Sequence, residues 1–306
     1  GAWSSLTSEN DLIDGAVLAA TALDERIYVA GEFCQVGGVV ASQIAGMDVN
    51  SSSWFPLGSG LDDAALALVG LSGRLYAGGR FTDAGGAAVS RIACWDTAAL
   101  SWSDLSGGVD GPFPEVSALA VLDDKVYAGG SFTSAGGMAA QNIACWNPVT
   151  SLWSPLSGGV DGRVSALVAL DGRLYAGGYF TTADGQNAAG VACWEPETHT
   201  WSALASGLGA DSIYVLPFVR AMTVLNGKLY VAGDFTTAGG QSAQRIACWD
   251  PALASWSDLE SGISEDVHAL VALGGRLYVG GWFSAAGGVA ANSLASWNPQ
   301  TRTWSS

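Results

Sequence analysis

The chain has 306 residues, of which 49% are apolar and only 13% are charged, and its formal net charge is −16. This composition supplies ample material for a hydrophobic core and excludes a disordered chain. The negative charge disfavours nucleic acid and anionic membranes as partners, because both attract a basic protein face. Apolar runs are short, and none reaches the roughly 20 residues of a membrane-spanning helix.

The sequence repeats with a period of about 50 residues, which is typical of solenoids and propellers. The marker of the repeat is a tryptophan that recurs at Trp3, Trp54, Trp102, Trp153, Trp201, Trp256 and Trp304. The periods run over residues 3–53, 54–101, 102–152, 153–200, 201–255 and 256–303. They fill the chain, so we expect residues 1–306 to form a single domain.

Each period predicts four short strands, as the fourth period illustrates. Its first strand, Val164–Leu170, is wholly apolar, and a tight turn at Asp171–Gly172 leads into the second strand, "RLYAGGYF". The third strand contains "VACW" from Val191, and the turn "EPET" precedes a fourth strand that begins at Trp201. No window shows helical periodicity. Four strands in about 50 residues are typical of a β-propeller blade.

The wording of the repeat resembles the kelch motif, in which an aromatic residue, a D-P-x-T turn and a tryptophan follow a glycine pair. The matching stretches include "WNPVTSLW" and "WEPETHTW", each downstream of a Gly-Gly strand. The "GGxFTxAGG…IAxW" pattern is similar to a kelch-like variant of secreted and surface proteins of microbes, and the propeller type is that of the central domain of galactose oxidase. The resemblance implies an all-β, six-bladed propeller with four antiparallel strands per blade. It is specific for the fold and not for an activity, because such propellers serve as binding modules, scaffolds or, more rarely, enzymes.

The two ends of the chain carry the same letters, "WSS", at Trp3 and at Trp304. In a closed ring we expect the N-terminal strand around Trp3 to supply the outer strand of the last blade. Residues 304–306 would then be surplus. A spare strand favours an alternative function, a structural module of an extracellular filament or cell-surface assembly that associates with itself through that strand.

Four cysteines occupy one equivalent position of the repeat, namely Cys94, Cys145, Cys193 and Cys248. Neighbouring blades stack about 10 Å apart, whereas a disulfide requires Cα atoms within about 7 Å. There is no C-x-x-C spacing of a zinc site. Because the same position holds Gly46 and Ser296 in the other periods, we predict a slot for a small, buried and unreactive side chain. Cys34 lies elsewhere and is expected to be a free surface thiol.

Catalytic motifs are absent from the sequence. There is no G-x-S-x-G elbow, no H-E-x-x-H or EF-hand run and no sialidase box S-x-D-x-G-x-x-W, and two histidines cannot supply the copper site of kelch-like oxidases. We therefore expect no metal, no cofactor and no enzymatic activity. The alternative is a hydrolase or lyase at the mouth of the channel, where Arg220 and His268 hold equivalent positions and Asp211 or Asp234 could add a carboxylate.

Insertions break the repeat on one face. The links between periods are alternately long and minimal. The long links are Ser8–Asp14, Val109–Glu115 and Gly209–Phe218. Strand parity places these links on the same face as the loops between second and third strands. Functional residues tend to lie on such loops over a rigid scaffold, and aromatic residues and arginine often anchor interfaces.

These observations predict a non-catalytic propeller that binds a glycan, a peptide or a neighbouring subunit on this face. The candidate residues are Phe113, Tyr214, Phe218, Arg220, His268, Arg80, Tyr179, Asp234 and Trp282. In the competing interpretation Phe113 and Phe218 fold back over the blade edges, and the alternation reflects descent from a two-blade unit. The resemblance and the glycosylation sequon at Asn50 favour an extracellular or cell-surface location. The five cysteines show no evident pattern of disulfide pairing, which argues mildly against that location.

Overall fold

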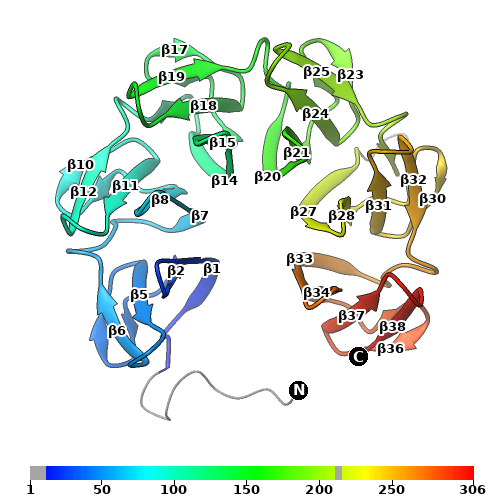
Figure 1. The fold of residues 1–306 in the computed structure, drawn as a ribbon, viewed down its shortest axis with the longest axis horizontal. Coiled ribbons are helices and arrows are strands. Elements are labelled where there is room, and N and C mark those ends of the chain that lie inside the picture. Colours follow the sequence, from blue (N-terminus) through cyan, green and yellow to red (C-terminus); the bar gives the residue numbers. More distant parts are fainter. Residues whose placement is uncertain (1–11, 211–215) are drawn as a thin grey trace. The chain divides into compact units, whose positions relative to one another are not determined.

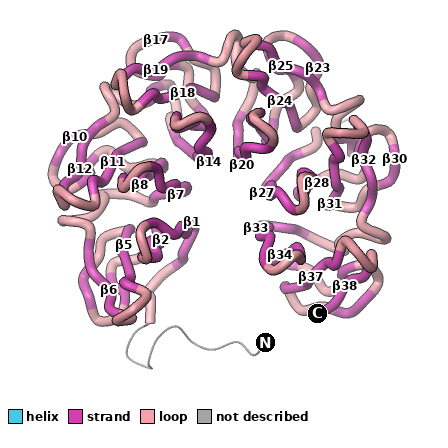
Figure 2. The backbone as a smooth tube through the Cα atoms, in the orientation of Figure 1, coloured by secondary structure: helices cyan, strands magenta, loops and turns pink. Residues whose placement is uncertain are grey.

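The fold is a four-stranded antiparallel sheet repeated along the chain (Figure 1). The computed structural model describes residues 12–210 and 216–306, and this part forms six such sheets. The backbone consists of strands joined by turns and loops (Figure 2). Among the described residues no helix is long and apolar enough to cross a membrane. The chain divides into two compact units.

The first unit extends to Ala140 and includes Ala144–Pro155. It contains three sheets, each with its strands in chain order from one edge to the other. The first sheet comprises β1 (Ala16–Leu23), β2 (Arg26–Glu32), β5 (Ile44–Asp48) and β6 (Ser53–Pro56). The second comprises β7 (Ala65–Leu71), β8 (Arg74–Gly79), β11 (Ile92–Asp96) and β12 (Ser101–Asp104). The third comprises β14 (Glu115–Leu122), β15 (Lys125–Ser131), β18 (Ile143–Asn147) and β19 (Leu152–Pro155).

The second unit contains Leu156–Ser306 together with Gln141–Ile143. Its three sheets have the same strand order. The fourth sheet comprises β20 (Arg163–Leu170), β21 (Arg173–Tyr179), β24 (Val191–Glu195) and β25 (Thr200–Ala203). The fifth comprises β27 (Phe218–Leu225), β28 (Lys228–Asp234), β31 (Ile246–Asp250) and β32 (Ser255–Asp258). The sixth comprises β33 (Asp266–Leu273), β34 (Arg276–Trp282), β37 (Leu294–Asn298) and β38 (Thr303–Ser305).

The expected strands of the fourth period match β20, β21, β24 and β25 to within one residue at each end. The sequence did not predict the small hairpin between the second and third strands. In five of the six periods its turn contains a glycine pair with positive φ, for example Gly85 at 65° and Gly86 at 86°, a conformation that glycine adopts without steric cost. In the fourth period the pair is Asp184–Gly185. The hairpins are β3 (Gln35–Val36) with β4 (Val39–Val40), β9 (Asp83–Ala84) with β10 (Ala87–Ala88), β16 (Ser134–Ala135) with β17 (Met138–Ala139), β22 (Thr182–Ala183) with β23 (Gln186–Asn187), β29 (Thr237–Ala238) with β30 (Gln241–Ser242), and β35 (Ala285–Ala286) with β36 (Val289–Ala290).

Each hairpin also holds the link that leads into its own sheet. The links β13 (Val109–Asp110) and β26 (Leu208–Gly209) pair with β16 and β29. Single bridges join three of the other links, as between Leu61 and Ala84. The links and the loops between second and third strands therefore lie on one face of each unit, as strand parity predicted.

Neighbouring sheets within a unit pack through a glycine of the second strand. A Cβ atom built on Gly78 would lie 2.4 Å from a methyl of Val116 in the next sheet. Gly177 has the same relation to Val219, at 2.6 Å, and to Met222. Because real Cβ atoms do not approach so closely, the glycine permits the tight packing of one sheet on the next.

The outer tryptophan of a sheet is hydrogen-bonded to the previous period. The indole N–H of Trp153, whose ring is 4% exposed, donates to the carbonyl of Leu105 at 2.6 Å. The same bond recurs with distances from 2.8 to 3.0 Å at Trp102 to Leu57, Trp201 to Leu156, Trp256 to Leu204 and Trp304 to Leu259. Each ring also packs against the tryptophan of the third strand, with centroids 5.3–5.4 Å apart.

Trp54 is the exception. Its indole nitrogen is buried and has no hydrogen-bond partner among the residues that the structure describes. In every other pair the acceptor leucine lies three residues after the tryptophan of the preceding period. By that offset the equivalent residue would be Leu6, which lies outside the described residues.

One expectation about the termini was wrong. The outer strand of the sixth sheet is β38, in which Trp304 pairs with Trp297 of β37. Residues 304–306 are therefore not surplus, and the place expected for the Trp3 strand is taken, while Trp3 itself lies outside the described residues. The physical reason is proximity in sequence, because β37 and β38 are joined by a short turn and their pairing closes only a small loop.

The tryptophan bond gives a testable prediction. Trp153→Phe keeps an aromatic ring but removes the indole N–H, so that the buried Leu105 carbonyl keeps only its second donor, the N–H of Gly108 at 3.1 Å. We expect the free energy of unfolding in urea to fall by about 0.5–1.5 kcal/mol, the net contribution of one hydrogen bond. Trp54→Phe is the matched control in the same unit and should cost less, because Trp54 has no such bond to lose. An equal loss in the two variants would contradict this role of the bond.

Candidate functional site

The repeated cysteines are packing residues, as predicted. Cys94, Cys145, Cys193 and Cys248 are free and buried. Burial raises the pKa of the Cys94 thiol to about 11, so the nucleophilic thiolate is scarce at neutral pH. In the first sheet the ring of Phe55 fills this space, since a Cβ on Gly46 would lie 2.2 Å from it. Cys34 is exposed and free, also as predicted.

Aspartates attach the links to the hairpins on the face where the candidate residues lie. The Asp161 carboxylate accepts the backbone N–H groups of Thr181 and Thr182 at 2.8 and 2.9 Å and the Thr181 hydroxyl at 2.6 Å. Asp62 makes the equivalent bonds to Thr82 and Asp83. Partial burial acts to raise the pKa of Asp161, but the hydrogen bonds to the ionised form outweigh it and lower the pKa below its ordinary value.

A β-bulge in the first strand of every sheet aims one side chain toward this face. The register shifts between Val219 and Ala221 in β27 and between Val267 and Ala269 in β33. The extra residue is Arg220 in one strand and His268 in the other. The equivalent residues in the other first strands are Leu18, Leu66, Ser117 and Ser165. The backbone feature is thus constant and architectural, whereas the side chain that it re-aims varies in chemistry.

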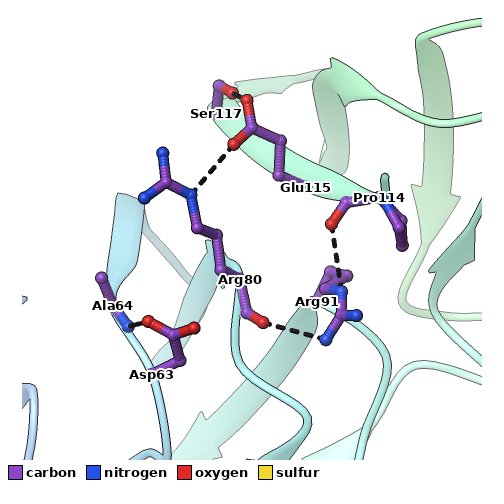
Figure 3. A network of polar contacts seen from close by, with 7 residues as sticks. All are labelled: Asp63, Ala64, Arg80, Arg91, Pro114, Glu115 and Ser117. Atoms are coloured by element: carbon purple, nitrogen blue, oxygen red, sulfur yellow. Dashed lines mark hydrogen bonds and ion pairs between the residues drawn. The ribbon is translucent and has the colours of Figure 1, made fainter. Parts of the chain in front are cut away.

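In the first unit this position belongs to a polar network between the second and third sheets (Figure 3). The guanidinium Nε of Arg80 donates to Glu115 at 3.1 Å, and the hydroxyl of Ser117 donates to the same carboxylate at 2.9 Å. Arg91 donates to the Pro114 carbonyl at 3.0 Å. The charge of Arg80 is therefore matched by Glu115. The network orders the start of β14.

In the second unit the equivalent positions carry aromatic rings. Tyr179, at the end of β21, and Phe218, at the start of β27, meet edge to face with ring centroids 6.2 Å apart. The guanidinium carbon of Arg220 lies 5.0 Å from the centre of the Phe218 ring. Arg220 also donates to both oxygens of Asp234, with the shortest distance 2.7 Å. We call these four residues the aromatic–arginine cluster.

The other predicted residues lie apart from this cluster. His268 packs edge to face on Trp282 with centroids 5.0 Å apart, and the Trp282 side chain is 73% exposed. Phe113 belongs to the other unit and is 89% exposed, so it does not fold back onto the sheets. Tyr214 lies outside the described residues.

The structure therefore unites four of the nine candidates in one cluster. Arg220 and His268, which hold equivalent positions in the fifth and sixth sheets, each have a partner of their own, Asp234 and Trp282. In the described ranges no group of three or more His, Cys, Asp or Glu residues is arranged to hold a metal ion. The variable positions were identified from the sequence, but the ion pair between Asp234 and Arg220 was not. The two residues lie on the paired strands β28 and β27, and the bulge at Arg220 shifts the register of that pairing.

Comparisons with known proteins identify the fold. Residues 170–196 and 226–251 match a family described as a domain of unknown function (DUF5122) β-propeller. No curated protein matches the chain. The crystal structure of the computationally designed Ika8 protein is similar over 97% of this chain and 75% of that protein, with a TM-score of 0.58 and 16% identity. Its identity is low enough that it shows the fold alone.

The chain is thus a β-propeller domain. Its repeated four-stranded sheets are those of a propeller of about six blades. The family match covers parts of the fourth and fifth periods, so the finer kelch assignment stays a prediction.

The hydrogen bonds by which Asp62 and Asp161 attach their links to the hairpins, here called the aspartate clips, predict that the stability of the fold falls in acid. A carboxylate whose pKa is lowered by folding stabilises the protein above the unfolded pKa of about 4, and this contribution is lost as the pH falls below that value. Serine accepts the same two N–H bonds at Ser264 in the sixth sheet. In the Asp62→Ser/Asp161→Ser variant, we expect the thermal midpoint to fall less between about pH 6 and pH 3 than in the parent. A parallel fall in the two proteins would contradict the clip.

Proposed function

We propose that this chain is a non-catalytic binding module that holds a partner at the aromatic–arginine cluster of the fourth and fifth sheets. The observation that supports it best is the exposure of Tyr179, which remains 49% exposed although its ring edge meets Phe218. Tyrosine and arginine are enriched among residues that anchor interfaces. An apolar ring beside a fixed charge offers both contact area and orientation to a partner.

The cluster is preorganised for binding. Asp234 fixes the guanidinium of Arg220 through two oxygens, and Phe218 supports it from the side. Side chains that are already held lose less conformational entropy when a partner binds. The pair of Arg220 and Asp234 adds no net charge, so recognition would rest on the ring faces and on hydrogen bonds at the rim. Flat surfaces with polar edges, as in sugar rings and extended peptides, suit this arrangement.

The test compares the parent protein with Tyr179→Ala and Phe218→Ala on a glycan array, against a random-peptide display library and by light scattering for self-association. We expect the class of partner bound by the parent to be bound at least about tenfold more weakly by the two variants, since each removes an anchor. The thermal midpoint should change little, because neither ring is fully buried.

The matched control is Leu253→Ala. Leu253 is 73% exposed in the turn between β31 and β32, at the other end of the fifth sheet. It should leave binding unchanged. Equal weakening by the control would place the binding surface elsewhere, and a large fall in the midpoint of Phe218→Ala would show that this ring is part of the core.

We further propose that the sheets close into a ring in which the first packs on the sixth. The first sheet of the first unit and the sixth sheet of the second unit each expose apolar residues that are buried at equivalent positions of other sheets. In the sixth sheet Leu273 is 67% exposed, whereas its equivalent Leu225 in the fifth is 7% exposed. In the first sheet Val17 is 43% exposed, whereas the equivalent Val219 is fully buried. Gly177 of the fourth sheet packs against Val219 of the fifth. The equivalent Gly280 of the sixth sheet has only the Cβ of Ala269 nearby, at 3.9 Å, which leaves room for a valine. Val17 of the first sheet is the residue equivalent to Val219, so the exposed faces of the sixth and first sheets are complementary.

Closure predicts a large cost for a charge at Val17. We expect Val17→Asp to lower the free energy of unfolding by about 3 kcal/mol or more, because the ring would bury an unpaired carboxylate. Val40→Asp is the control at a site that is 71% exposed, and it should cost less than about 0.5 kcal/mol. A small effect at both positions would show an open arrangement. A midpoint that depends on protein concentration would show that another copy covers the face.

A further inference from the structure

A cavity lies between the second and third sheets, at the turn end that is opposite to the links. Its floor includes Tyr76 and its rim includes Arg74, and its volume is about 600 Å³. Equivalent cavities, lined by Arg173 and Tyr175 or by Lys228 and Tyr230, have volumes of about 290 and 240 Å³. The repeat therefore builds a small cavity between neighbouring sheets, and this one is enlarged.

One wall of the enlarged cavity is apolar. It is lined by Leu71, Pro148 and Val149. Val149 is 88% exposed, so its side chain is accessible at the rim of the cavity. The equivalent residues in the fourth and sixth sheets are the polar Glu197 and Gln300.

Two carboxylates line the same cavity. One oxygen of Asp96 accepts the N–H groups of Ala98 and Ala99, and the other lies 3.8 Å from the Arg74 guanidinium. In the equivalent pairs the corresponding distances are shorter, 2.6 Å from Arg173 to Glu195 and 2.9 Å from Lys228 to Asp250. The outer oxygen of Asp96 is thus held only loosely by its own arginine.

The second carboxylate, Asp124, stands at an unusual backbone position. Its φ is 54°, in the left-handed region that glycine adopts more easily. The equivalent turn residues are Gly73, Gly172, Gly227 and Gly275 in four of the other five sheets. The third sheet therefore carries a carboxylate at the cavity where most other sheets carry no side chain.

We propose that this cavity binds a lysine or arginine side chain of a peptide partner. The aliphatic stem lies against Leu71, Pro148 and Val149, and the cationic head lies between Asp96 and Asp124. Long basic side chains bury their stems in this way while the charge meets polar groups. The net charge of −16 favours the encounter, because it attracts cationic partners to the whole surface.

The probe is a blocked peptide, acetyl-Ala-Leu-Lys-Leu-Ala-amide. The uncharged comparison is the same peptide with norleucine in place of lysine. Dissociation constants are measured by NMR titration of the complete chain. We expect the norleucine peptide to bind at least about tenfold more weakly, and the lysine peptide to weaken as salt rises, because screening reduces the attraction. Equal affinity of the two peptides would overturn the proposal.

The chain offers matched substitutions for the protein side. Asp96→Asn and Asp124→Gly introduce residues that other sheets carry at these positions, Asn147 and Gly172, so the fold should tolerate both. Each variant should bind the lysine peptide at least about tenfold more weakly, since each removes one of two carboxylates around the cation. Unchanged binding in both variants would refute the site.

Asp250→Asn is the control, because Asp250 holds the position of Asp96 in the fifth sheet and its substitution changes the net charge by the same amount. It should leave the affinity unchanged, and an equal loss would show a general field effect instead of a site. Phe218→Ala should bind the lysine peptide like the parent. This result separates the cavity from the aromatic–arginine cluster, so the two proposals stand or fall independently.

Discussion

The structure depends on one repeated hydrogen bond, from the indole N–H of an outer tryptophan to a leucine carbonyl of the preceding period. It is buried at Trp153 and Trp201, and an unpaired donor or acceptor there would cost free energy. The bond joins the outer strand of a sheet to the link that leads into that sheet, so it fixes where the chain enters each repeat. A repeat protein in which every unit contacts chiefly its neighbours is stabilised by such interface contacts.

This framework lets the chemistry at one position vary without disturbing the backbone. Every first strand contains the same bulge, but the residue at the bulge is Ser117 in the third sheet, Arg220 in the fifth and His268 in the sixth. Around it, the first unit places the Arg80–Glu115 ion pair and the second places the rings of Tyr179 and Phe218 at equivalent points. The same logic holds at the turn end, where Asp124 takes the place of a glycine. Function on this scaffold is a matter of which side chains are placed at fixed positions.

Much of the fold followed from periodicity. The strands of the fourth period, the buried cysteine slot and the common face of links and loops were all predicted, because each is a local pattern repeated six times. The glycine-pair hairpins were missed, since two-residue strands carry no periodic pattern of their own. The outer strand of the sixth sheet was assigned wrongly, because identical letters at Trp3 and Trp304 do not indicate which segment pairs with β37. Arg220 and Asp234 were both named as candidate site residues, but their direct ion pair was not foreseen.

By itself the sequence determined the class of the fold, the number of repeats and the buried character of the recurring cysteines and tryptophans, because these depend on spacing and side-chain type alone. The tertiary structure alone decided which variable residues meet. Tyr179 and Phe218 are far apart in the chain and touch only because one sheet packs on the next. Asp96 and Asp124 line one cavity for the same reason. Contacts between sheets depend on bulges, displaced ladders and the exact depth of packing, and none of these leaves a pattern in a single sequence.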